Sequence, residues 1–370
     1  MSALVTILVG LFSFVAALLP TAVYALLVWW ADRYEKEPPK MLIAAFIWGS
    51  IPAVIASALV ELAFHSPVAA ISGEYGPIVG ASLVAPPVEE TIKGLAVLAV
   101  FWLARHEFDD VLDGVIYGAI VGLGFAMTEN VVYFLRAWQK AGLVGWSYIV
   151  PIRTIVFGLN HAMFTSLTGI GFGLARFQKP FLYKVLFALS GLAAAMTAHF
   201  IHNFFASLGP TCILSFLADW MGVATIIVII ALSLKRERAW ITAELADEID
   251  LGILTPLQYE ALASSRGRLR QGWQLLGISG LSRMRLWYKL ADAAIELAFK
   301  KHQRKNMGEE RGINEIITAL RAEIVRLRER LGEEGLEKAS VCSQCGQLST
   351  DPTIEVCPHC NATKTNGKTA

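Results

Sequence analysis

Long runs of apolar residues fill the first 234 positions, and the few polar residues inside them recur at helical spacing. Seven runs are long enough to cross about 30 Å of hydrocarbon, which takes roughly 20 residues of helix. They cover approximately residues 4–30, 41–64, 76–104, 114–135, 149–174, 182–208 and 212–234. The pattern predicts an all-α polytopic membrane protein with about seven transmembrane helices.

Composition agrees with this interpretation and divides the chain. The 370 residues are 55% hydrophobic and 17% charged, and most charged residues follow Leu234. The net charge of +1 therefore describes neither part and says nothing about partners. We predict a membrane domain over residues 1–234, a cytosolic helical region over 235–337, and a small module over 338–370 with a flexible C-terminus.

Lysine and arginine in the short loops indicate the orientation. They gather after the first, third and fifth spans and at the start of the tail: Arg33, Lys36, Lys40, Arg105, Arg176, Lys179, Lys184, Lys235, Arg236 and Arg238. The other side offers Arg136, Lys140 and Arg153. Because positive residues stay in the cytosol, we expect a multi-pass protein of the cell membrane with its N-terminus outside and its tail cytosolic.

Four groups of polar residues interrupt the apolar spans. They are Glu89, Glu90 and Lys93 in the third span, Glu129 and Asn130 in the fourth, Asn160, His161 and Thr165 in the fifth, and His199, His202 and Asn203 in the sixth. At about 1.5 Å of rise per residue, the ionisable groups lie about 20–25 Å from the cytosolic span ends. Four helices of alternating direction therefore place them in one layer, just outward of the bilayer centre.

Charged side chains at this depth are costly, so they usually face a bundle interior or a water-filled cavity. Glu89 and Glu90 are about 100° apart around a helix, so one faces the cavity while the other meets a neighbour. Lys93 can neutralise either acid, and a plain ion pair that locks helices together is the structural alternative.

Three functions fit these groups. Glutamate, histidine and asparagine in one layer suit activation of water against an amide carbonyl, and two histidines with a carboxylate also suit a metal. A proton-coupled transporter or channel needs intramembrane acids and histidines too. The third possibility is a non-catalytic scaffold. Ionisable residues in all four groups argue against it, because a pocket without activity would not need residues that are costly to insert into a membrane. The glycines in GAIVGLG and GIGFG are assigned to helix packing.

The motifs, in this order, resemble the PrsW family of intramembrane proteases. EETIK has the form EExxK, FAMTEN has the form FxxxEN, His161 follows Arg153, and HFIHN has the form HxxxN; DRYEKEP follows the first span. The family is distantly related to CAAX prenyl endopeptidases and bacteriocin-processing membrane proteins. The likeness covers roughly residues 20–210 and implies cleavage of membrane-anchored protein substrates near or within the bilayer, often in regulated signalling.

Carried onto this chain, the resemblance implies a catalytic set of Glu89, Glu90, Glu129, His161, His199 and Asn203, with Lys93, Asn130 and His202 in support. One of the two adjacent glutamates is expected to be the general base. Glu129 is expected as its partner or a metal ligand, the two histidines as oxyanion donors or ligands, and Asn203 as an oxyanion donor. Both a catalytic metal and a glutamate-activated water stay open.

Four cysteines near the C-terminus predict a separate metal site. They follow a C-x2-C-x11-C-x2-C pattern: Cys342, Cys345, Cys357 and Cys360. Four thiolates at this spacing match a closed, structural zinc site, a zinc ribbon, and a cytosolic tail argues against two disulfides.

The rest of the tail predicts helices. Thr255 with Pro256 predicts a helix start, and an apolar stripe along residues 313–331 predicts a helix that packs on its neighbours or forms a short coiled coil. We expect no nucleic-acid partner; the expected partners are the lipid bilayer, a membrane-anchored substrate and a protein that binds the cytosolic tail.

Overall fold

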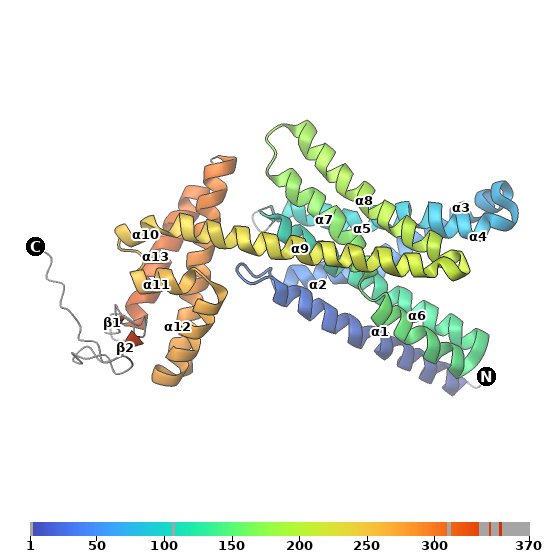
Figure 1. The fold of residues 1–370 in the computed structure, drawn as a ribbon, viewed down its shortest axis with the longest axis horizontal. Helices are drawn as coiled ribbons and strands as arrows, with labels where there is room; N and C mark the ends of the chain where they lie inside the picture. Colours follow the sequence, from blue (N-terminus) through green and yellow to red (C-terminus); the bar gives the residue numbers. More distant parts are fainter. Residues whose placement is uncertain (1–2, 106–107, 309–311, 333–339, 342–347, 350–370) are drawn as a thin grey trace, which may run out of the picture. The chain divides into compact units, whose positions relative to one another are not determined.

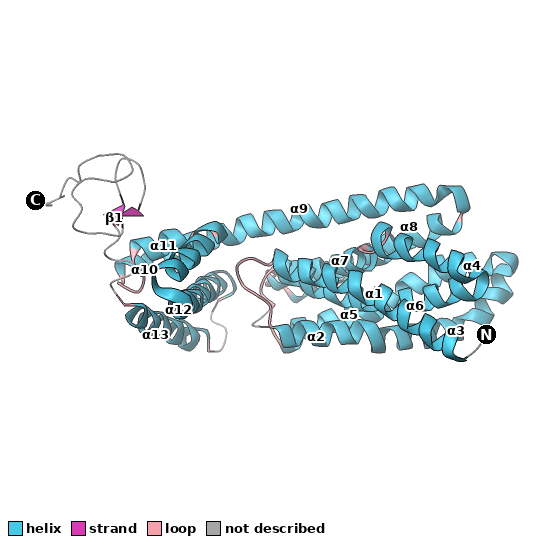
Figure 2. Ribbon diagram, turned by 90° about the horizontal axis from the view of Figure 1, so that it is seen from below, coloured by secondary structure: helices cyan, strands magenta, loops and turns pink. Residues whose placement is uncertain are grey.

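The computed structural model describes residues 3–105, 108–308 and 312–332, together with the two short strands 340–341 and 348–349. The chain divides into two compact units, Met1–Lys235 and Arg236–Ala370, which are described separately (Figure 1). Apart from the strands, the described residues are helices and their connections (Figure 2). The all-helical prediction is therefore confirmed for the membrane part.

The first unit contains nine α-helices among its described residues. They are α1 (Ala3–Ala31), α2 (Pro39–Trp48), α3 (Val54–Ser72), α4 (Gly76–Val79), α5 (Ala85–Leu103), α6 (Val111–Pro151), α7 (Asn160–Arg176), α8 (Phe181–Ser207) and α9 (Cys212–Leu245), which continues into the second unit after Lys235. Three π-helical segments join some of them: η1 (Gly49–Ala53), η3 (Gly80–Val84) and η4 (Ile152–Val156). Two short 3-10 segments are η2 (Gly73–Tyr75) and η5 (Gly209–Thr211).

Five helical stretches of the described chain are long and apolar enough to cross a membrane. They are Leu4–Ala31, Pro39–Leu103, Val111–Arg176, Phe181–Ser207 and Cys212–Asp250. The second and third run for 65 and 66 residues, about three times the roughly 20 residues that one crossing needs. Each has an internal turn: Gly73 has a φ of 54°, and Ala141 and Gly142 leave the helical conformation inside α6. The chain is thus a multi-pass membrane protein.

The outer surface of this unit has the apolar character expected of a lipid-facing surface. Large apolar side chains are mostly exposed on several helices, including Leu4 of α1 (65%), Leu62 of α3 (71%), Leu182 of α8 (65%) and Met221 of α9 (70%). In water such a surface would be unfavourable, but in a bilayer it meets acyl chains. Hydrocarbon therefore takes the place of solvent around these helices.

The centre of the unit is the pair α6 and α7. Nearly all of α6 from Val111 to Met127 is buried, and α1, α2, α5 and α7 pack against it. Close approach of the two backbones requires glycine. A Cβ on Gly169 would overlap the carbonyl oxygen of Gly114, and one on Gly122 would overlap the carbonyl oxygen of His161. The glycines predicted to serve packing do so, and Gly122 also fixes how closely α6 approaches His161.

The second unit contains α10 (Asp247–Asp250), α11 (Pro256–Leu262), α12 (Ser265–Met307) and α13 (Ile313–Leu331). Thr255 caps α11 by accepting a hydrogen bond from the Gln258 amide, as its sequence predicts. The predicted stripe of α13 is buried against α12, with its members Ile313, Ile317, Leu320, Ile324, Leu327 and Leu331 all below 9% exposure. Only Ile316 of the predicted stripe is exposed, at 38%.

The two short strands form an antiparallel ladder. In it β1 (Ser340–Val341) pairs with β2 (Leu348–Ser349), and Ser340 lies opposite Ser349. The four cysteines of the predicted zinc site lie outside the described residues.

Candidate functional site

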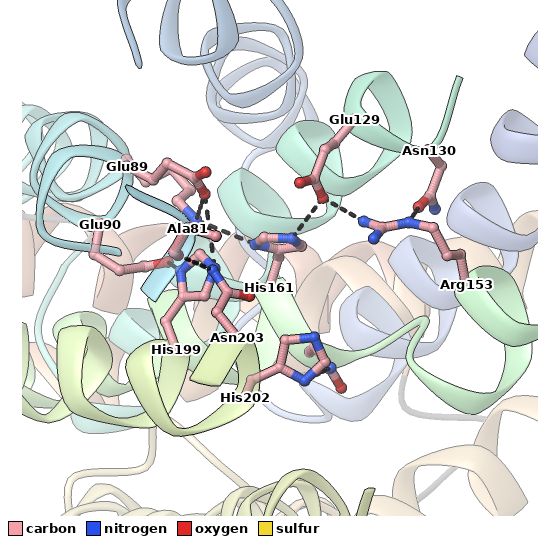
Figure 3. Close-up of polar contacts among 12 residues, drawn as sticks. Ala81, Glu89, Glu90, Glu129, Asn130, Arg153, His161, His199, His202 and Asn203 are labelled. Carbon is pink, nitrogen blue, oxygen red and sulfur yellow. Dashed lines mark hydrogen bonds and ion pairs between the residues drawn. The ribbon is translucent and has the colours of Figure 1, made fainter. Parts of the chain in front are cut away.

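Four helices bring the predicted polar groups together inside the membrane unit. Glu89, Glu90 and Lys93 project from α5, and Figure 3 shows two of them facing His161 from α7 and His199 from α8. Glu90 and Lys93 are fully buried, and the other three are less than 9% exposed. α5 begins with Ala85, Pro86 and Pro87, and proline is well tolerated in a first helical turn because its missing N–H has no partner there.

Lys93 lies at the centre of the cluster. Its Nζ is 2.5 Å from Glu90 Oε1, 3.5 Å from Glu89 Oε2 and 3.2 Å from His161 Nδ1. The ammonium also lies over the Phe125 ring, 4.2 Å from its centroid, in a cation–π contact. One buried cation therefore contacts both acids, where the sequence predicted that it could neutralise either.

The two adjacent glutamates have different surroundings. Glu90 Oε1 contacts Lys93 and His199 Nδ1 (2.9 Å), while its Oε2 accepts a hydrogen bond from Thr165 (3.0 Å). Glu89 makes longer contacts: its Oε2 is 3.5 Å from Lys93 and 3.9 Å from His199 Nε2. Glu90 is thus held on both oxygens, whereas Glu89 is the more loosely bound acid.

The hydrogen-bond partners fix the tautomer of both histidine rings. The Lys93 ammonium can only donate, so His161 Nδ1 accepts and its Nε2–H donates to Glu129 Oε2 at 2.9 Å. The carboxylate of Glu90 can only accept, so His199 Nδ1–H donates to it and His199 Nε2 keeps a lone pair that faces Glu89. An acceptor nitrogen and a loosely held carboxylate therefore lie side by side.

Glu129 and Asn130 form the outer edge of the cluster. Glu129 pairs with Arg153 of η4, and Asn130 Oδ1 accepts from Arg153 Nε at 2.7 Å. The Arg153 guanidinium also lies over the Tyr133 ring, 3.8 Å from its centroid. Glu129 was expected as a partner of the base or as a metal ligand. In the structure His161 lies between Glu129 and Lys93, with Nε2 at Glu129 and Nδ1 at Lys93.

Asn203 and His202 lie apart from the acid–histidine cluster. Asn203 Nδ2 donates to the Ala81 carbonyl of η3 at 2.8 Å, which ties α8 to the segment before α5 (Figure 3). His202 Nδ1 lies 2.7 Å from Asp219 Oδ2, and Asn160 Nδ2 donates to the same oxygen at 2.9 Å. These residues surround the cluster and hold the helices that carry it.

Ser215, His202 and Asp219 invite comparison with a catalytic triad, and the geometry excludes one. Ser215 Oγ and Asp219 Oδ2 both lie 2.7 Å from the same ring nitrogen, His202 Nδ1. A triad needs the hydroxyl and the carboxylate on opposite ring nitrogens, so that the ring can carry a proton between them. Asp219 therefore anchors His202 rather than activating Ser215.

Sequence reasoning missed two acids near the site. Asp219 of α9 is 1% exposed, and Glu61 of α3 has a buried Oε1 that has no hydrogen-bond partner among the described residues. Each is a single acid within an otherwise apolar span, in SFLADW and ALVELAF. An isolated intramembrane acid is itself a functional signal, and that rule would have found both.

The donor set is of a kind that holds a metal ion. Glu89, Glu90, His161 and His199 each offer one ligand atom, and these atoms lie within 4.8 Å of one another. Carboxylates and imidazoles are zinc ligands. Lys93 competes for the same atoms, since it contacts three of these four side chains. Glu129, expected as a possible ligand, is not in this group.

A multi-pass helical protein with acids and histidines gathered between its helices has the architecture of an intramembrane hydrolase. A family model described as PrsW family intramembrane metalloprotease matches residues 37–233. The chain belongs to this family, as its motifs predicted.

Curated relatives agree with this assignment. A Protease PrsW of Geobacillus kaustophilus (strain HTA426) is 31% identical over 148 residues, which is 40% of this chain and 59% of the relative. Those of Clostridioides difficile (strain 630) and Bacillus subtilis (strain 168) are 31% and 26% identical, over 42% and 40% of this chain and 63% and 61% of the relatives. The chain thus spans less than two thirds of the length of these relatives. No solved structure matches it.

Proposed function

We propose that this chain is an intramembrane endopeptidase that hydrolyses peptide bonds of membrane-anchored substrates. The observation that carries the proposal is the unequal pair of glutamates: Glu90 is held on both oxygens, while Glu89 is loosely held beside the free Nε2 of His199. A general base needs a carboxylate that is placed but not fully engaged. The family names and motifs favour a protease over a transporter or scaffold.

Glu89 is the proposed base. It takes a proton from a water molecule, whose oxygen forms a bond to the substrate carbonyl carbon; the same proton then goes to the leaving nitrogen as the C–N bond breaks. When Glu89 is protonated, its hold on Lys93 weakens, so an ammonium N–H becomes available to the negative oxygen of the intermediate. Before the proton transfer, Lys93 Nζ, 3.5 Å from Glu89 Oε2, keeps the base oriented.

His161 has a positioning role in this scheme. Its Nε2–H donates to Glu129, and Arg153 in turn holds Glu129, so the ring keeps Nδ1 directed at Lys93. Asn203 holds η3 through Ala81 and still has a second N–H, which can serve the oxyanion.

A metal ion would use the same residues. Glu89, Glu90, His161 and His199 would hold it, and it would supply Lewis-acid polarisation of the carbonyl and a more acidic water. Lys93 contacts three of these four side chains, so a metal ion could bind to them only if the Lys93 contacts were broken. Metal analysis of protein with its four tail cysteines replaced separates the two mechanisms.

The proposed topology has seven crossings. The turns at Gly73 and at Ala141–Gly142 divide the two longest apolar stretches into two crossings each, which adds two to the five stretches. The loop charges support an outer N-terminus and a cytosolic tail. We also assign residues 235–337 to a cytosolic helical region that a partner protein could bind, and the remote kinship with CAAX endopeptidases stays part of the proposal.

The tail is proposed to end in a zinc ribbon over residues 338–370. The strands β1 and β2 flank the first Cys-x2-Cys pair, an arrangement that suits a metal knuckle. Four thiolates would close this site, so its zinc would be structural.

The test is cleavage of a membrane-anchored substrate by the protein reconstituted in liposomes. Glu89→Gln should abolish cleavage, because an amide cannot accept the proton, and Glu90→Gln and His199→Ala should each reduce it strongly. Glu74→Gln is the matched control, since Glu74 is an exposed acid of the same unit. Full turnover by Glu89→Gln would remove the base assignment, and full turnover by all three variants would remove the proposed function.

A further inference from the structure

The helix α12 of the second unit is a hairpin. Gly280 has a φ of 79° and interrupts it, so one arm runs over residues 265–279 and the other over 281–307. The Trp287 indole N–H donates to the Arg268 carbonyl at 3.0 Å, although the two residues are 19 positions apart. In a straight helix, 19 residues would span about 28 Å. The two arms therefore lie antiparallel, and the chain reverses around Gly280.

The hairpin carries most of the exposed large apolar side chains of its unit. Within the described residues after Lys235 there are six such side chains, and four of them lie between positions 269 and 281. These four, which we call the apolar patch, are Leu269 (53% exposed), Trp273 (63%), Ile278 (69%) and Leu281 (47%). Leu269 and Trp273 share one helix face, and the other two flank the reversal.

The same segment is strongly basic. Residues 264–291 include no aspartate or glutamate but carry Arg266, Arg268, Arg270, Arg283, Arg285 and Lys289. Four of these, Arg266, Arg270, Arg285 and Lys289, are exposed. The preceding residues 236–263 have the opposite balance, with six acids and two arginines. Basic charge and exposed apolar surface thus coincide in one part of the unit.

We propose that the α12 hairpin docks on the anionic surface of the bilayer that holds the first unit. Arginine and lysine are attracted to acidic lipid headgroups, and an indole favours the interface between water and hydrocarbon. The tether to the membrane unit is short, because 19 residues lie between Leu245, the last residue of α9, and Ser265, the first residue of α12. A short tether raises the local concentration of the surface, so weak contacts suffice. The proposal does not depend on peptidase activity.

Two other occupants could cover the apolar patch: a second copy of this chain, or the chain's own segment after Gly332, which contains Glu333, Glu334 and Glu337. Charge favours the lipid, because the segment offers three acidic residues whereas an anionic leaflet offers a continuous surface of negatively charged headgroups. Neither of these alternatives requires acidic lipid. The lipid composition around the protein is therefore the variable that separates them.

The experiment uses the full chain in nanodiscs made of phosphatidylcholine alone or mixed with phosphatidylglycerol. An environment-sensitive fluorescent residue replaces Ile278 at the reversal, and the control protein carries it at Ala322, an exposed position on α13. We expect lipid-borne quenchers to quench the probe at 278 several-fold more strongly in the anionic discs, and the probe at 322 equally weakly in both. Salt should weaken the effect.

Replacing the four exposed basic residues by glutamine should abolish the quenching, with about a fivefold lower ratio of docked to undocked hairpin for each charge removed. Replacing the three arginines by lysine keeps the charge and should preserve it. The proposal is overturned if quenching at 278 is independent of phosphatidylglycerol, or if the probe there is equally shielded in detergent. Those outcomes would indicate the acidic segment or a second copy.

Discussion

Removing the Lys93 ammonium tests the central arrangement of the site directly. Lys93→Met keeps most of the length of the side chain, one atom shorter, and deletes the charge that contacts Glu89 and Glu90. Both carboxylates then share a buried space without this cation. Breaking a buried ion pair from one side costs about 3–5 kcal/mol, because the remaining charge is left uncompensated. We expect a loss of this size in the free energy of unfolding, together with loss of cleavage.

A double-mutant cycle isolates the pair between Lys93 and Glu90, whose Nζ and Oε1 are 2.5 Å apart. Glu90→Gln removes the acid and retains its shape. If the two groups are coupled as the distance indicates, the double variant loses about 2 kcal/mol less than the sum of the single losses. The free energies are measured by unfolding in mixed micelles with increasing denaturing detergent.

The matched control is Lys40→Met, which removes an exposed lysine of the same unit and should change the free energy of unfolding by less than about 0.5 kcal/mol. The reasoning is refuted if the Lys93 and Glu90 losses add to within about 0.5 kcal/mol, since additivity means that the groups do not interact.

Three further predictions concern residues around the site and in the tail. Asp219→Asn, which weakens the anchor of His202 and Asn160, should lower kcat for cleavage about tenfold, and an unchanged kcat would exclude a positioning role. Gly122→Ala should destabilise the protein by about 1–3 kcal/mol in thermal or detergent unfolding because its Cβ meets the His161 carbonyl, whereas Gly10→Ala, with open space around it, should not. Cys342→Ser should reduce the zinc content measured by mass spectrometry by about one ion per chain, and retention of that zinc would contradict the four-thiolate site.

Much of the site could be predicted from sequence, because the depth of a residue in the membrane can be estimated by counting residues from the end of its helical span. Glu90, His161 and His199 fall at similar distances from their span ends, and the structure brings their side chains within hydrogen-bond reach of Lys93 or of each other. Long apolar runs likewise predicted the membrane helices, since length and hydropathy define a membrane crossing. The family assignment followed from four motifs in order, and the family model confirms it.

The remaining features depend on contacts that spacing does not determine. Asn203 shares a helix face with His199, yet its amide reaches the Ala81 carbonyl, because η3 brings that carbonyl within range. The difference between Glu89 and Glu90 depends on Thr165 and His199, which belong to other helices. Asp219 stands alone in its span without a motif, so it was missed, and only the rule on isolated intramembrane acids would have found it.

The π-helical segment η3, directly before α5, has a consequence for which glutamate faces which neighbour. A π-helical turn holds about one residue more than an α-helical turn, so everything after it is rotated by about 100° relative to a continuous α-helix. Glu89 and Glu90 are also about 100° apart. If the same residues formed a continuous α-helix, Glu89 would therefore face the direction that Glu90 now faces, and Glu90 would turn away from its present neighbours. The different surroundings of Glu89 and Glu90 thus depend on a segment that lies five to ten positions before them in the sequence.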